Sequence, residues 1–292
     1  SLFWSQWMGD FYNTSLVNWL VDDWKVSVVR AAMGVKHEET KSGYLYDGTE
    51  KKKITTVVDA AIKKGIYVII DWHDHYAFKN QKESIRFFEE MARKYGEYPN
   101  VIYEIFNEPI REPWTSVVKP YSEAVVAAIR AIDPDNIIII GTPSWCQNVD
   151  EAANDPLEGE NLTYALHFYA ATHRGELRDK AEFALNKGIS LFVSEFGTCL
   201  ASGNGFLDTA ETEEWFNFME EHHLSWCNWS IANKNETASA LLPGTRPVGY
   251  WQESNLSQSG KIVRKKLRRY AGIIDVEKPQ KVRKSFFKLK PI

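Results

Sequence analysis

The chain has 292 residues, of which 44% are hydrophobic and 25% charged, so it is long enough for a large core and too apolar for a disordered protein. Its net charge of −4 gives no general attraction to nucleic acid or to anionic membranes. No uninterrupted apolar run is long enough to span a bilayer. Many of the 11 Trp, 13 Tyr and 15 Phe must lie in the core, and so many Trp also suit a surface that stacks on flat, apolar ligand faces such as sugar rings.

Taken in chain order, short apolar runs alternate with amphipathic segments. The strands that we expect cover residues 27–32, 66–71, 101–106, 137–140, 162–168, 189–196 and 224–230, and residues 2–4 read as the tail of a first strand. The helices that we expect cover residues 15–23, 50–64, 82–95, 117–132, 177–186, 212–222 and 260–270. Strands that are apolar throughout are typical of parallel sheets covered on both faces.

Eight strand–loop–helix units, the short first one included, predict a single α/β domain that closes into a (β/α)8 TIM barrel. We expect this barrel to occupy residues 1–272. Residues 273–292 are rich in lysine, and we interpret them as a basic C-terminal tail or the beginning of a linker. No glycine-rich phosphate loop follows the early strands, which disfavours a dinucleotide-binding fold.

The stretch from Val101 to Pro109 organises the rest of the chain. Its buried strand contains Glu104 and ends in Asn107-Glu108, and a second strand carries Glu195 near its end. In barrel enzymes the chemistry takes place at the carboxyl ends of the strands. Polar and aromatic residues gather at these ends in our prediction, namely Arg30, His73, Asn107, Glu108, His167, Tyr169, Glu195 and Trp229. The set is hard to explain by folding alone, because burying it costs desolvation and returns little stability.

Two carboxylates that face each other suit the cleavage of a glycosidic bond, in which one donates a proton and the other attacks the anomeric carbon. We expect burial and like charge to raise the pKa of Glu108, and Arg30 and Tyr169 to hold Glu195 ionised. Asn107 is placed to bond a sugar hydroxyl.

A metal site is the rival interpretation, because Asp71, His73, Asp74 and His75 crowd one strand end. We disfavour it because Trp72 separates Asp71 from His73 and alternate strand residues point to opposite faces, and we expect neither a metal nor a cofactor. The cysteines Cys146, Cys199 and Cys227 have neither metal-site nor disulfide spacing, and we interpret them as small buried residues. No Gly-x-Ser-x-Gly nucleophile elbow is present.

The chain resembles glycoside hydrolase family 5, and most closely its bacterial endo-β-1,4-glucanases. The resemblance rests on six stretches in family order: RAAMG at Arg30, IIDWHDH at His73, IYEIFNEP at Glu108, HFYA at His167 and Tyr169, VSEFGT at Glu195, and SWCNWS at Trp229. It implies a (β/α)8 barrel and a retaining mechanism, with Glu108 as acid/base and Glu195 as nucleophile. It assigns the other strand-end residues to supporting roles, and Trp7, Trp145, Lys234 and Glu236 to substrate binding.

Two departures from the family pattern stand out. The family has more chain before its first strand, so we expect that strand to be short or clipped here. The loop from Val35 to Tyr46 is more charged than the family pattern, with Lys36, His37, Glu38 and Glu39.

The leading hypothesis is an endo-acting β-1,4-glucanase. The same chemistry on β-mannan, mixed-linkage glucan or xyloglucan is the alternative, because loops set the subsites. A non-catalytic glycan-binding pseudo-enzyme is a third hypothesis, disfavoured because binding alone does not need both glutamates. We expect a secreted monomer that acts on a β-glucan polysaccharide, without a nucleic-acid or membrane partner, and that is part of a longer modular chain.

Overall fold

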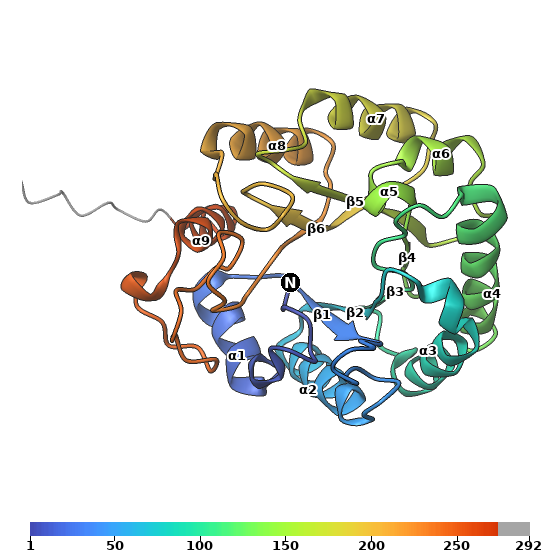
Figure 1. Ribbon diagram of the computed structural model, residues 1–292, viewed down its shortest axis with the longest axis horizontal. Helices are drawn as coiled ribbons and strands as arrows, with labels where there is room; N and C mark the ends of the chain where they lie inside the picture. Colours follow the sequence, from blue (N-terminus) through green and yellow to red (C-terminus); the bar gives the residue numbers. More distant parts are fainter. Residues whose placement is uncertain (274–292) are drawn as a thin grey trace, which may run out of the picture.

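Seven strands pair in chain order to form one parallel sheet in the computed structural model, which describes residues 1–273 (Figure 1). The strands are β1 (Val28–Gly34), β2 (Tyr67–His73), β3 (Val101–Glu104), β4 (Ile138–Ile140), β5 (Leu162–Tyr169), β6 (Leu191–Gly197) and β7 (Trp226–Asn228). All pairings are parallel, from β1–β2 to β6–β7. A parallel pair needs a long crossover between its strands, and this is why helices separate most of them.

The helices form a ring outside the strands (Figure 1). They are α1 (Thr14–Trp19), α2 (Thr49–Lys64), α3 (Gln81–Tyr95), α4 (Lys119–Arg130), α5 (Pro143–Cys146), α6 (Val149–Asn154), α7 (Gly175–Asn186), α8 (Thr209–Glu221) and α9 (Gln258–Tyr270). Short 3₁₀ turns occur at Gly9–Phe11, Ala77–Asn80 and Glu253–Asn255, and π-helical turns at Leu20–Trp24 and Trp114–Val118. Among residues 1–273, no helix combines the length and the apolar character that crossing a bilayer requires.

The first strand expected from the sequence is present as a single bridge. Leu2 pairs in parallel with Ile231, which follows β7, and the Leu2 N–H donates to the Arg30 carbonyl in β1 over 2.9 Å. The Ile231 N–H donates in turn to the Ser1 carbonyl over 2.8 Å. The start of the chain therefore fills the gap between β7 and β1, and the expected (β/α)8 architecture is confirmed.

Several boundaries differ from the sequence prediction. The helix expected over residues 15–23 becomes π-helical from Leu20 and ends at Lys25, which has a left-handed φ of 61°. Two short helices, α5 and α6, lie between β4 and β5, where no helix was assigned from the sequence. The tail expected over residues 273–292 lies outside the described residues, apart from Ile273.

The interior of the barrel is layered. An apolar cluster inside it includes Ile69, Ile102 and Ala165, one from each of three strands. Because strand side chains alternate in direction, the residues two positions further along these strands face the same interior one layer higher. These residues are Asp71, Glu104 and His167, all buried. The period of the strands therefore stacks a polar layer on an apolar one at the carboxyl end of the barrel.

Candidate active site

Arg30 is the centre of the polar layer. Its side chain is fully buried on β1. The guanidinium donates from Nε to Glu104 over 2.6 Å, from Nη1 to Glu195 over 3.0 Å and from Nη2 to the Asn107 side chain over 2.6 Å. Nη2 also lies 3.0 Å from Asp71. One cation thus holds three carboxylates and one amide from three segments of the chain, which fixes the end of β6 relative to the end of β3.

Glu195 lies near the end of β6 with its two oxygens held separately. Oε2 accepts from Arg30, and Oε1 accepts from the Tyr169 hydroxyl over 2.9 Å. Both contacts were expected from the sequence. They aim the carboxylate into the barrel mouth, where Glu108 lies opposite.

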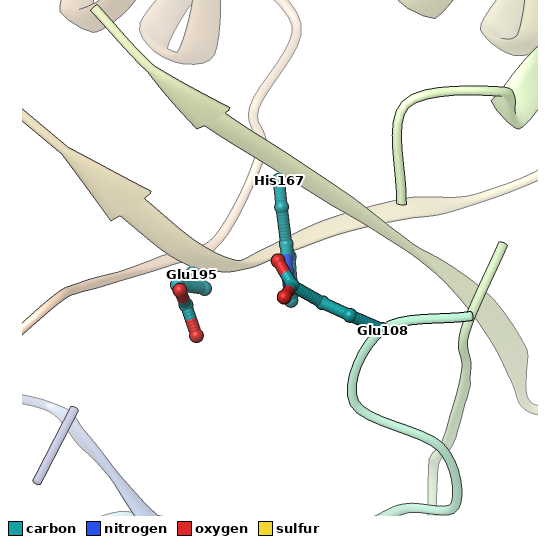
Figure 2. Close-up of side chains that lie close together, drawn as sticks. All are labelled: Glu108, His167 and Glu195. Carbon is teal, nitrogen blue, oxygen red and sulfur yellow. The ribbon is translucent and has the colours of Figure 1, made fainter. Parts of the chain in front are cut away.

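Glu108 follows β3 and lies against His167 of β5 (Figure 2). Its Oε1 is 3.0 Å from His167 Nδ1, and its Oε2 is 3.6 Å from Nδ1 of His75. His167 Nε2 lies 2.9 Å from the Ser194 hydroxyl, which fixes the plane of the ring. Oxygens of Glu108 and Glu195 lie within 4.8 Å of each other and of a ring nitrogen of His167.

The pKa shifts in this group reverse the expectation from the sequence. Burial lowers the pKa of His167, but the Glu104 and Glu108 carboxylates outweigh burial and raise it to about 9. Burial raises the pKa of Glu108, but the neighbouring His167 cation lowers it more, so the net shift is downward. Burial and the charge of Glu108 raise the pKa of Glu195 despite Arg30 and Tyr169. The prediction of a raised pKa at Glu108 was therefore wrong, because the imidazole lies in direct contact with this carboxylate.

His73 and Trp229 form one wall of the barrel mouth. Their rings are stacked, with centroids 5.1 Å apart and an interplanar angle of 4°, and Trp4 meets the His73 ring edge-on at 4.0 Å. His73 Nδ1 lies 2.6 Å from Asp71, which Arg30 also contacts. Asp71 and His73 thus share a face, contrary to the geometric reason given against a metal. Among the described residues, potential ligand atoms converge at Glu108, His167 and Glu195 rather than at Asp71–His75.

A cavity of about 720 Å³ opens at the carboxylate pair. Trp145, 42% exposed, lines it together with Glu108, Glu195, His167 and Tyr169. Gln147, Asn148 and His173 also line it and were not singled out in the sequence. The exposed indole of Trp145 therefore lies beside the pair.

Trp7, Lys234 and Glu236 do not line that cavity. Trp7, 46% exposed, follows the bridge between β7 and β1, across the barrel from Trp145 after β4. Lys234 and Glu236 form an ion pair of 2.5 Å in the segment after β7, and Lys234 lies over the Phe3 ring. The predicted substrate-binding residues thus fall into two groups on opposite sides of the carboxylates.

Sequence reasoning did not assign Glu104, Asp71 or Ser194 to the site. Glu104 and Asp71 are fully buried carboxylates on Arg30, and Ser194 anchors the ring of His167. Glu104 and Asp71 could have been found from the sequence, because each is a charged residue inside an otherwise apolar strand. Ser194 carries no comparable signal, because a serine in a strand is ordinary.

Comparison with known proteins gives consistent matches. A family model described as Cellulase (glycosyl hydrolase family 5) matches residues 1–235. Endoglucanase Z of Dickeya dadantii is 53% identical, in an alignment that covers 90% of this chain and 60% of the relative. Endoglucanase A of Evansella cellulosilytica is 47% identical, in an alignment that covers 92% of this chain and 55% of the relative. A solved structure from Cytophaga hutchinsonii matches with a TM-score of 0.91 and 54% identity, covering 93% of this chain and 88% of its own. The chain spans just over half the length of these two endoglucanases.

Proposed function

The chain belongs to the cellulase family, glycosyl hydrolase family 5, and from this membership and the site geometry we propose that it is a retaining, endo-acting glycoside hydrolase. Its substrate is an internal β-1,4-glucosidic bond of cellulose or a related β-glucan. The endoglucanase relatives support this substrate. Trp145 and Trp7 support it too, because exposed indoles on both sides of the carboxylates suit a chain of sugar rings that crosses the barrel mouth.

The close approach of the two glutamates is the observation that carries the proposal. One oxygen of Glu108 and one of Glu195 lie within 4.8 Å of each other. Retaining glycosidases keep their carboxyl groups about 5–5.5 Å apart, whereas inverting ones need about 6.5–9.5 Å to admit a water molecule. The approach of these two oxygens supports the retaining arrangement, in which one carboxylate attacks the anomeric carbon directly.

In the first step, Glu195 attacks the anomeric carbon and Glu108 protonates the glycosidic oxygen, which leaves with its sugar chain. In the second step, Glu108 removes a proton from water, the water oxygen bonds to the anomeric carbon, and the Glu195 ester bond breaks. Two inversions at one carbon give net retention. Arg30 and Tyr169 stabilise Glu195 as an anion each time it is released.

His167 supplies the proton that Glu108 needs. With its pKa raised to about 9, His167 carries a proton at neutral pH, and its Nδ1 is 3.0 Å from Glu108. Transfer of this proton leaves a neutral ring and a protonated carboxyl. The sequence predicted that a raised pKa would keep Glu108 protonated. In this mechanism Glu108 instead receives its proton from His167.

Hydrolysis of carboxymethyl-cellulose by the wild type and by Glu195→Gln tests the proposal. We expect activity in the wild type and a loss of at least about a hundredfold in the variant. NMR of products from a cello-oligosaccharide should show the β anomer first. An α product contradicts retention, and tight oligosaccharide binding without turnover at any pH identifies a pseudo-enzyme.

The preferred polysaccharide follows from a panel of cellulose, β-mannan, mixed-linkage glucan and xyloglucan, on which we expect the highest kcat/KM for β-1,4-glucan. We also propose that residues 1–272 form the catalytic domain of a modular, monomeric, secreted enzyme, since a polymeric glucan lies outside the cell. Size-exclusion chromatography and assay of the culture supernatant test these two points.

A further inference from the structure

A second cavity, of about 430 Å³, lies beside Trp7 on the side of the site away from Trp145. We name it the Trp7 pocket. Three segments form it: residues 7–11, the first turns of α2, and the segment after β7. The residues that matter for its chemistry are Trp7, Gly9, Asp10, Lys53 and Asn233. All three segments follow carboxyl ends of strands, so the pocket opens on the same rim as the carboxylate pair.

A buried network holds the Lys53 ammonium in the wall of this pocket. Lys53 Nζ donates to Glu50 Oε1 over 2.6 Å and to the Ser5 carbonyl over 3.0 Å. Glu50 is 3% exposed and accepts from the Ser5 hydroxyl through its other oxygen. An ammonium has three donors, so one remains for a ligand on the open side, where the side chain is 27% exposed.

Gly9 creates the space for this ammonium. A Cβ atom at Gly9 would lie 2.8 Å from Lys53 Cε and 2.9 Å from Nζ. Any other residue at position 9 would therefore displace the head of Lys53 from its place in the wall. The glycine is needed here for close approach rather than for a turn.

Asp10 and Asn233 complete the polar lining. The Asn233 Nδ2 donates to the Thr245 carbonyl over 2.7 Å, which orients the amide and leaves its oxygen as an acceptor. The Asp10 side chain is exposed, and its carboxylate forms no ion pair within residues 1–273. One positive and one negative charge beside an indole disfavour a purely anionic ligand, and the polar wall disfavours an apolar one.

We propose that the Trp7 pocket binds a further glucosyl unit of the substrate, beyond the unit that stacks on Trp7. A pyranose ring presents hydroxyl groups that both donate and accept, and here an ammonium, a carboxylate and an amide oxygen meet them beside an aromatic face. The volume admits such a unit. The inference rests on the proposed function for the identity of the sugar.

The experiment measures binding without turnover, in the Glu195→Gln background, by calorimetric titration with cello-oligosaccharides from triose to hexaose. We expect affinity to rise with chain length, with a final gain when the added unit reaches the Trp7 pocket. Asp10→Asn and Lys53→Met should each remove this gain and weaken binding of the longest oligosaccharides by about three- to tenfold, with the shorter ones unchanged. Gly9→Ala should act in the same direction.

Lys64→Met is the matched control. Lys64 lies on the same helix, is also 27% exposed and also pairs with a carboxylate, that of Asp22, but it does not line the pocket. Its variant should keep the complete length profile. Asp10→Asn guards against misfolding, because it exchanges an exposed side chain for one of the same shape.

Three results would overturn the proposal. The first is an unchanged dependence of affinity on oligosaccharide length in Asp10→Asn and Lys53→Met, and the second is an equal loss of affinity at every length in these variants. The third is the absence of any gain in affinity with length in the Glu195→Gln protein itself. The proposed function fails separately, when protein with Glu195 intact does not hydrolyse oligosaccharides. Binding by the Glu195→Gln series still reports on the pocket in that case.

Discussion

The Cys146 thiol lies 3.0 Å from the carbonyl oxygen of Asn107, so the turn that carries Trp145 is bonded to the segment that carries Glu108. Burial raises the pKa of this thiol well above its usual range, which keeps it protonated as a donor. Its sulfur also accepts from the Thr142 N–H at 3.4 Å. Ser144, Trp145 and Cys146 all have left-handed φ angles of 55–58°, a conformation that costs non-glycine residues energy. The thiol is thus one of the contacts that hold this turn in place.

Cys146→Ala should therefore loosen the Trp145 platform. We expect KM for cello-oligosaccharides to rise about three- to tenfold, the worth of one hydrogen bond, with a smaller change in kcat. Cys146→Ser should restore most of the loss, because its hydroxyl also donates. In the Trp145→Ala background, Cys146→Ala should add little. Additive losses in this double-mutant cycle, measured by steady-state kinetics, would contradict the coupling.

The pH profile should report on Glu195 and His167. As the proposed nucleophile, Glu195 must be ionised to attack, and its pKa is raised, so activity should begin to rise with pH above the usual carboxyl range. Glu108 and His167 together must retain a proton, so activity should fall as pH passes the His167 pKa of about 9. A profile of kcat/KM against pH measures both the acidic limb, where activity rises, and the alkaline limb, where it falls.

His167→Gln tests the origin of the alkaline limb. Without the imidazole, a carboxyl alone must keep the proton, so the limb should move down by more than about one pH unit. Ser194→Ala removes the hydroxyl near the ring but leaves the imidazole, and it should shift the limb less. An alkaline limb that stays near 9 in His167→Gln would assign the proton to another group.

The sequence predicts those parts of this site that follow from the hydrophobic periodicity of a single strand or helix. The alternation of strands and helices placed Glu108 and Glu195 at strand ends, and both lie at the barrel mouth. The protonation pattern did not follow, because it depends on a 3.0 Å contact between Glu108 and His167, 59 residues apart. The wall of the Trp7 pocket was missed for the same reason, since Gly9 and Lys53 are brought together only by the packing of α2 beside the start of the chain. Strand patterns fix which face a residue occupies, but packing decides which residues meet there.

Glu108→Gln should separate acid catalysis from nucleophilic attack. For an unactivated cello-oligosaccharide, loss of the proton donor should lower kcat/KM by about 10²–10⁴-fold. A dinitrophenyl cellobioside has a leaving group that departs as an anion and needs no proton. For this substrate the rate of glycosyl-enzyme formation should fall much less. Glu195→Gln should lose activity on both. Stopped-flow measurement of dinitrophenolate release makes the comparison, and an equal loss on both substrates in Glu108→Gln would argue against the acid role.

Gly141, which follows β4, should be intolerant of a side chain because it lies against the segment that carries Glu108. A Cβ atom there would be 2.3 Å from the Phe106 carbonyl oxygen and 3.1 Å from Pro109 Cδ. Backbone cannot yield as a flexible side chain can, so Gly141→Ala should destabilise the fold by about 1–3 kcal/mol and lower kcat by displacing Glu108. Gly175→Ala is the control, since its Cβ position at the start of α7 has no described atom within 4 Å beyond its chain neighbours and the adjacent helix backbone, and it should be neutral or stabilising by up to about 1 kcal/mol. Urea denaturation of both variants compares the free energies of unfolding. Wild-type stability and kcat in Gly141→Ala would mean that the two strand ends are not in contact, and the placement of Glu108 would then need another cause.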